Sequence, residues 1–245
     1  MLELKNVNKY YGHKRALSDI TLSLPRGEIV GLFGENGAGK TTLMKSILAY
    51  HSFSGDITLD GDPITKNNIA KISFATSEHS FFSNLSADAH KTFYQEHFPK
   101  FSEKRFVALM DFFDLRHHTP LRSFSMGQKN QFEVIMALCQ GADYILMDEP
   151  FAGNDVFNRE DFYKVLLGIL EPNETLLLST HLIEEVSDII GRAVLLKQGC
   201  IVGDITTEAL EESGKTLMDY IKETHRYRSD RVSRALNDLR GEDSQ

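Results

Sequence analysis

The chain has 245 residues, of which 41% are apolar, so it can bury the core of one large domain or of one domain with an inserted subdomain. Its formal net charge of −8 argues against a nucleic-acid partner and against direct adhesion to anionic lipid. No stretch approaches the ~18 consecutive apolar residues of a membrane-spanning helix. The first residues, MLELKNVNKYYG, lack the apolar segment of a signal peptide. We therefore expect a cytosolic protein that reaches any membrane through a protein partner.

The N-terminal part predicts strands and one helix. Alternating apolar or β-branched residues indicate short strands at LELKNV (2–7), ITLSL (20–24) and DITLD (56–60). The compact apolar run EIVGLF (28–33) is typical of a strand covered on both faces. Helical spacing follows it at 39–49.

The middle of the chain differs from both flanks. From about Ser83 to Leu138 the apolar spacing is helical, as in DAHKTFYQEHF and EKRFVALMDFFDL, and strand signals are absent. We interpret residues 83–138 as a helical subdomain inserted between the first strands and the next buried strand.

The C-terminal part alternates again. Strands are predicted at 144–148, 175–179 and 193–197, and helices at 157–170 and 182–190. This alternation favours an α/β fold with a mostly parallel sheet.

A charged tail ends the chain. We place the main domain at residues 1–220 and the tail at 221–245, in which Val232, Leu236 and Leu239 predict one face of a surface or partner-docking helix.

The first chemical motif is GENGAGKT, which fits G-x-x-x-x-G-K-[ST] at every fixed position and stands between a predicted strand and a predicted helix. Its glycines let backbone N–H groups turn toward phosphates, and the helix adds its positive N-terminal end. Lys40 is expected to reach the β- and γ-phosphates, and Thr41 to offer its hydroxyl to Mg²⁺. The predicted nucleotide-binding set here is Gly34, Glu35, Asn36, Gly37, Ala38, Gly39, Lys40, Thr41 and Thr42.

The second motif is the acidic pair that ends YILMDEP. Asp148 is expected to hold Mg²⁺, through water, and Glu149 to polarise the attacking water, since adjacent strand residues point in different directions. An ordinary acidic helix cap is the alternative. A guanine-reading NKxD element is missing from the sequence, so we expect ATP rather than GTP.

A histidine, His181, follows the buried strand in LLLSTHLIEEV. Such a residue is often purely structural, but in this position it can donate a hydrogen bond to a γ-phosphate oxygen.

These motifs, in this order, resemble the ATP-binding cassette (ABC) family over about residues 2–220. FSMGQ (124–128) is similar to the family's LSGGQ signature at the head of a helix. The resemblance implies a P-loop NTPase fold, with a mostly parallel core, an antiparallel N-terminal β part and the inserted helical subdomain. It also places Tyr11, rather than Tyr10, where an aromatic ring stacks on adenine.

The resemblance further implies a mechanism. Two cassettes face each other head to tail, so Ser125, Gly127 and Gln128 of one chain act on the γ-phosphate held by the other. The second cassette is an identical or a different chain. Separate transmembrane subunits complete a transporter, which keeps this chain at the inner face of the membrane. The chain as a whole, including FYQEHFPKFSEKRF (93–106) ahead of the signature, is similar to small bacterial export-type cassettes, which handle drugs, lipids or antimicrobial peptides.

Three departures from the family pattern affect metal coordination and coupling. Ser77 stands where the family places a glutamine, Phe124 and Met126 replace two signature residues, and Asn154 precedes the matching Asp155 in place of leucine. Two alternatives stay open beside a transporter ATPase: a soluble ABC ATPase without a membrane partner, and a nucleotide-gated module that barely hydrolyses ATP, which Ser77 favours slightly and Glu149 and His181 oppose.

Overall fold

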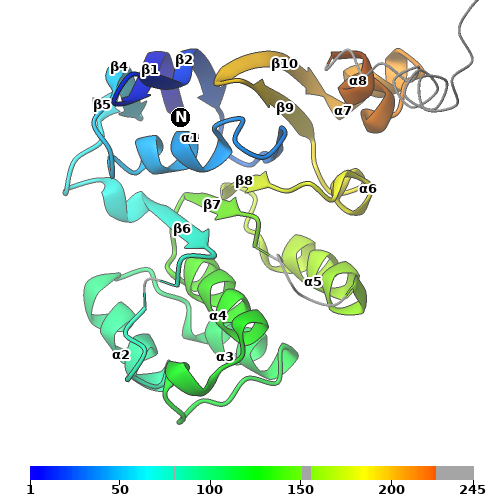
Figure 1. The fold of residues 1–245 in the computed structure, drawn as a ribbon. Coiled ribbons are helices and arrows are strands. Elements are labelled where there is room, and N and C mark those ends of the chain that lie inside the picture. The colour runs from blue at the N-terminus through cyan, green and yellow to red at the C-terminus, as the bar shows by residue number, and fades with distance from the viewer. Residues whose placement is uncertain (80, 151–155, 225–245) are drawn as a thin grey trace, which may run out of the picture.

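The structure is a computed structural model that describes residues 1–79, 81–150 and 156–224. In this described part, the strands form two sheets, and three helices project from the edge of the larger one (Figure 1). No helix within these ranges is long and apolar enough to cross a membrane.

The smaller sheet is antiparallel, with strand order β2-β1-β4-β5. Its strands are β1 (Leu2–Tyr11), β2 (Lys14–Leu24), β4 (Ser54–Leu59) and β5 (Asp62–Pro63). The buried residues of β1 alternate along its first half, which gives the sheet one apolar face for the core.

The larger sheet has strand order β10-β9-β3-β8-β7-β6, and all neighbouring pairs are parallel except β9 with β10. Its strands are β3 (Ile29–Phe33), β6 (Ile72–Thr76), β7 (Tyr144–Asp148), β8 (Thr175–Ser179), β9 (Arg192–Lys197) and β10 (Cys200–Thr206). Every residue of β7 and β8 is buried, which explains the apolar runs in their sequences, YILM and LLL.

Helix α1 (Lys40–Ile47) lies between the two sheets (Figure 1). Leu43, Met44 and Ile47 are fully buried in one apolar cluster with residues of both sheets. Because α1 is covered on two sides, its N-terminal end has a fixed position at the carboxyl edge of the larger sheet.

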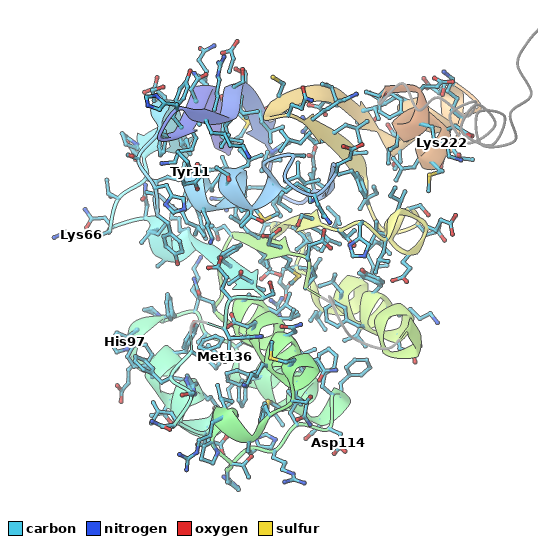
Figure 2. All side chains as sticks on the ribbon, in the orientation of Figure 1. Tyr11, Lys66, His97, Asp114, Met136 and Lys222 are labelled. Carbon is cyan, nitrogen blue, oxygen red and sulfur yellow. The ribbon has the colours of Figure 1, made fainter. Side chains whose placement is uncertain are left out.

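The helical part between β6 and β7 contains α2 (Ala87–His97), α3 (Glu103–Phe112) and α4 (Met126–Cys139). Serine side chains cap all three at their N-termini. In Figure 2, His97 and Asp114 mark its outer surface, whereas Met136 of α4 is fully buried. Short 3₁₀ turns at Ile69–Lys71 and Leu121–Ser123 precede β6 and α4.

The remaining helices are α5 (Val156–Ile169), α6 (Ile183–Val186), α7 (Thr207–Glu212) and α8 (Leu217–Thr224). The predicted α/β architecture, with its parallel core and antiparallel N-terminal part, is confirmed. The helix predicted at 182–190 is shorter in the structure and covers only Ile183–Val186. The proposed boundary at residue 220 falls inside α8, and the tail helix predicted beyond it lies outside the described residues.

Candidate functional site

The phosphate-loop motif forms the turn between β3 and α1. Gly37 has φ +81° and Gly39 has φ +113°, in the left-handed region that favours glycine. A Cβ atom on Gly39 would lie 2.9 Å from the carbonyl oxygen of Ala16, so a side chain there would clash with the backbone as well. The loop therefore depends on glycine for both its turn and its close packing.

Lys40 begins α1 and is 7% exposed. Its Nζ donates a hydrogen bond to the carbonyl oxygen of Gly34 at 2.8 Å and lies 3.7 Å from a carboxylate oxygen of Glu149. The ammonium group is thus fixed between the loop and the acidic pair.

The two carboxylates of the acidic pair have different surroundings. Asp148 is buried, and its oxygens accept hydrogen bonds from the hydroxyls of Thr41 and Ser179. Glu149 has φ +48°, which is rare for a residue with a side chain and costs about 1–3 kcal/mol. Its N–H donates to the carbonyl oxygen of Ser179 at 3.0 Å. The chain therefore bends sharply after Asp148, and this bend sends the two side chains to different partners.

His181 follows β8, next to the acidic pair. Its Nδ1 lies 2.8 Å from Oε2 of Glu149, and its side chain is 62% exposed. Glu149 consequently sits between two nitrogen groups, the ammonium of Lys40 and the imidazole of His181.

A cavity of about 560 Å³ runs along this constellation, a volume in the range of small-molecule sites. Its wall includes Tyr11, which comes from the end of β1, and both carboxylates, Asp148 and Glu149. Its wall also includes, from the motif, Asn36, Gly37, Gly39, Lys40, Thr41 and Thr42. Tyr10 is not part of this wall and instead has the guanidinium of Arg15 above its ring at 5.9 Å.

Four predicted residues lie beside the cavity rather than on its wall. Gly34, Glu35 and His181 line a separate cavity of about 290 Å³ that α8 borders. Ala38 is buried, and its carbonyl oxygen accepts a hydrogen bond from the N–H of Gly199 at 2.9 Å. These residues shape the loop from outside the larger cavity.

The signature-like segment begins α4, away from this cavity. Ser125 caps the helix: its hydroxyl accepts from the N–H of Gln128, and the Gln128 side chain accepts from the N–H of Ser125. Ser125 and Met126 are exposed. None of the residues 125–128 lines the cavity of its own chain.

The structure describes Ser77, the first of the positions that depart from the family pattern. Ser77 comes directly after β6, whose last residue, Thr76, is the register partner of Asp148. Glu78 is drawn aside by an ion pair with Lys45 of α1. Asn154 and Asp155 lie outside the described residues.

Several residues of the site carried no sequence signal that we used. Lys14, Arg15, Gln198 and Gly199 also line the cavity, and Ser179 holds Asp148. The Gln198–Gly199 pair, with φ +50° and +80°, is a turn that its Gln-Gly sequence could have indicated. The others come from strands and loops that are distant in sequence.

Comparison with known proteins identifies the family. Residues 17–152, more than half of the chain, match the family model described as ABC transporter. The chain is 28% identical over 252 residues to a galactofuranose transporter ATP-binding protein of Escherichia coli K12, covering 89% of this chain but only 50% of that protein. It is 26% identical over 205 residues to a lantibiotic transport ATP-binding protein of Streptococcus pyogenes, covering 82% of this chain and 89% of that protein.

Solved structures agree at the level of the fold. An ATP-binding subunit of an ABC transporter superimposes with a TM-score of 0.82 at 23% identity, covering 92% of this chain and 99% of that one. A dimeric ATP-binding cassette in a post-hydrolysis state, bound to ADP and Pi, gives a TM-score of 0.73 at 22% identity, covering 84% and 98%. With its family-model match and its ordered motifs, the chain belongs to the ABC transporter family and has the fold of that family's ATP-binding domains.

Proposed function

We propose that this chain binds and hydrolyses ATP as the nucleotide-binding subunit of an ABC transporter, in a dimer that drives separate transmembrane subunits. One observation carries the proposal: a single cavity joins an exposed tyrosine ring to a glycine-rich loop, a buried lysine and two carboxylates with different partners. The ring suits a base, and the loop, the lysine and the carboxylates suit a chain of phosphates that ends in a reactive γ-phosphate.

In the proposed complex, the adenine stacks on Tyr11 and the phosphates accept hydrogen bonds from the loop N–H groups and Lys40. A charge-assisted hydrogen bond from Lys40 is shorter and stronger than a neutral one. Lys40 must turn from the Gly34 carbonyl oxygen to do this, and a charged phosphate oxygen is a stronger acceptor than that neutral carbonyl oxygen.

The residues present fit Mg²⁺. Asp148 and Thr41 supply hard oxygen ligands, already joined to each other by a hydrogen bond. Within the described residues, no group of three or more His, Cys, Asp or Glu side chains forms a metal site by itself. Such a partial ligand set suits a metal that binds together with phosphate oxygens, where it neutralises their charge.

For hydrolysis, Glu149 accepts a proton from the attacking water while the oxygen of that water bonds to the γ-phosphorus. The bond to the β-γ bridging oxygen breaks, which gives ADP and phosphate. His181 holds the carboxylate of Glu149 in place and can turn toward a γ-phosphate oxygen.

The partners follow from the exposed signature. Because Ser125, Gly127 and Gln128 do not line their own cavity, they are free to contact the γ-phosphate of a facing cassette, identical or different. We place the chain at the inner face of the membrane, bound to its transmembrane subunits. The transported substrate is not assigned, since one relative is named for galactofuranose and another for a lantibiotic.

The test is Mg-ATP titration calorimetry together with phosphate release. Lys40→Ala removes charge-assisted hydrogen bonds worth about 1.5–3 kcal/mol each, so ATP should bind at least about 100-fold more weakly. The matched control is Lys66→Ala, at an exposed lysine in the loop after β5 (Figure 2), which should bind like the wild type. Unchanged ATP affinity in Lys40→Ala, with circular dichroism unchanged, would refute the site. ATP binding without turnover in the wild type would favour a nucleotide-gated module.

A further inference from the structure

The tyrosine on the cavity wall, Tyr11, has a buried cation against its ring. Lys9 and Tyr11 lie two residues apart at the end of β1, and Nζ of Lys9 is 4.8 Å from the centroid of the Tyr11 ring. Tyr11 is 46% exposed and lines the cavity, whereas Lys9 is 6% exposed and does not. The ammonium is therefore a buried partner of a ring that is itself partly exposed and lines the cavity.

Lys9 is an unusual residue on this side of the sheet. The buried face of β1 is apolar at Leu2, Leu4 and Val7, and Lys9 continues it after an irregularity in the strand register. Nζ donates a hydrogen bond to the carbonyl oxygen of Ser52 at 2.7 Å. Among the described side chains, no carboxylate lies within 4.0 Å of it. A buried ammonium needs compensation, and the aromatic face of Tyr11 supplies part of it.

A second contact fixes the same ring. His51 meets Tyr11 in a T-shaped arrangement, with ring centroids 5.6 Å apart and planes at 82°. His51 and Ser52 belong to the turn after α1, so one turn holds both Lys9 and Tyr11. The other end of α1 carries Lys40 and Thr41, which ties the ring position to the phosphate loop through a single rigid helix.

We propose that Lys9 is a positioning residue for base recognition, which holds the Tyr11 ring in register with the phosphate loop and draws π density toward its buried face. A ring depleted of π density on one side is a better stacking partner for an electron-rich purine on the other. This inference rests on the proposed function, in which Tyr11 stacks on adenine. Lys9 acts only through Tyr11 and touches no part of the nucleotide itself.

The experiment compares two ligands in the presence of Mg²⁺: ATP, which has a base, and inorganic tripolyphosphate, which has none. Lys9→Met keeps most of the side-chain stem and removes the charge, so ATP should bind about three- to tenfold more weakly. Tripolyphosphate should bind as it does to the wild type. Lys9→Arg keeps a cation above the ring and should recover most of the ATP affinity.

A double-mutant cycle separates this role from a merely structural one. Tyr11→Leu should weaken ATP binding, and adding Lys9→Met to Tyr11→Leu should weaken it no further. Equal losses for ATP and tripolyphosphate, or a Lys9→Met loss that persists without the Tyr11 ring, would overturn the inference. So would an unchanged ATP affinity in Lys9→Met.

Two further arms keep the test decisive. If Lys9→Met does not fold, His51→Ala takes its place in the same cycle. It should lose less ATP affinity than Lys9→Met would and no tripolyphosphate affinity. An ATP affinity equal to that of the wild type would then count against the inference. A wild-type chain that binds no ATP refutes the proposed function itself. If the wild type binds ATP, Tyr11→Leu binds it more weakly and Lys9→Met binds it as the wild type does, only the role of Lys9 is refuted.

Discussion

The two carboxylates of the acidic pair differ in their contacts and in their exposure, even without a ligand. Asp148 has both oxygens engaged by hydroxyl groups, from Thr41 and Ser179, and it is buried. Glu149 is partly exposed, and its carboxylate contacts the nitrogen groups of Lys40 and His181. A carboxylate fixed by two hydroxyls is suited to hold a metal in one place, while a partly exposed carboxylate on the cavity wall is suited to accept a proton.

The strained backbone of Glu149 supports this division. An extended residue after Asp148 would continue the strand, but φ +48° turns the chain, and the Glu149 N–H is anchored on Ser179. Such strain persists only where surrounding contacts hold it. Ser179, fully buried at the end of β8, therefore holds the carboxylate of Asp148 and the backbone N–H of Glu149 at once.

Ser77 gives the first residue-scale prediction. It follows Thr76 at the edge where Asp148 lies, but its side chain is short and exposed. Ser77→Gln should leave ATP affinity similar and raise hydrolysis up to about tenfold, the value of one added hydrogen bond to the metal-bound or attacking water. Steady-state phosphate release across a Mg²⁺ titration measures this. Identical rates and Mg²⁺ dependence would mean that residue 77 is not equivalent to the family's glutamine.

At this scale the sequence predicted the residues whose chemistry is written in a local motif. Lys40, Thr41, Asp148 and Glu149 do come together on one cavity. Ser179, Lys9 and Gln198 were not predicted, because their contacts join β8, β1 and the β9–β10 turn to the site only after folding. A lone serine or lysine in a strand has no pattern that distinguishes these roles.

Among the elements, the fully buried strands were the most predictable. YILMD and TLLLS coincide with β7 and β8 residue by residue, since a strand with helices on both faces has an unbroken apolar sequence. β10 was missed because its residues alternate between partly buried and exposed at the edge of the sheet. α7 and α8 carry no motif, and each buries only one residue.

Helix α4 shows why a capping motif and a functional motif can coincide. Ser125 and Gln128 form a reciprocal cap at its start, which accounts for their spacing without any ligand. The cap also leaves the first N–H groups of a 14-residue helix at the surface. The same two residues can therefore stabilise α4 and present an anion site to another chain.

Helix α2 provides a prediction on pH. His90 is 1% exposed, its Nδ1 lies 2.8 Å from the carbonyl oxygen of Ser86, and rings of Phe81, Phe82 and Phe132 surround it. Burial lowers the pKa of His90, and the Ser86 contact opposes this only in part.

Because the folded state disfavours the charged ring, the unfolded chain binds more protons below its histidine pKa of about 6.5. Stability should therefore be fully present above that pH and decrease as pH falls toward the lower pKa of the folded state. The slope reaches at most about 1.4 kcal/mol per pH unit for one group. Urea unfolding at pH 7.5, 6.5 and 5.5 measures it.

His90→Gln removes the titrating ring and should flatten this decrease. His97→Gln, at an exposed histidine on the same helix (Figure 2), should keep the wild-type profile. His79 contributes in the same direction, since burial and the charge of Lys129 lower its pKa, so the His90→Gln profile should retain some slope. A His90→Gln profile as steep as that of the wild type would contradict the assignment to His90.

In the whole molecule, the cavity and the signature lie in different parts of one chain. The cavity is bounded by the two sheets and α1, while Ser125 begins α4 in the helical part (Figure 1). The helical part is tied to the core by Arg105 of α3, whose guanidinium forms two hydrogen bonds with Glu174 and two with backbone carbonyl oxygens of Leu138 and Ile169. The bonds to Glu174 and Ile169 connect α3 to the end of α5 and the segment before β8, and so link the helical part to the core.

Glu149→Gln links the chemistry to the assembly. The substitution removes the proton acceptor but keeps the size of the side chain, so hydrolysis should fall about 10²–10⁴-fold. Binding should survive, because Lys40, Thr41 and Asp148 are unchanged. ATP should then persist between two facing chains, and light scattering should show a dimer that forms with ATP and not with ADP.

Met126 offers a matched control for the proposed dimer, in which ATP lies between the loop of one chain and the signature of the other. Its side chain is next to Ser125 and is 63% exposed in its own chain. Met126→Glu, added to Glu149→Gln, places a negative charge opposite the partner's γ-phosphate and should abolish the ATP-dependent dimer while ATP still binds. Met126→Leu should preserve it. If the chain requires a different cassette, that cassette is included in every mixture. Wild-type hydrolysis in Glu149→Gln would refute its catalytic role, whereas a dimer insensitive to Met126→Glu would place the interface elsewhere on the molecule.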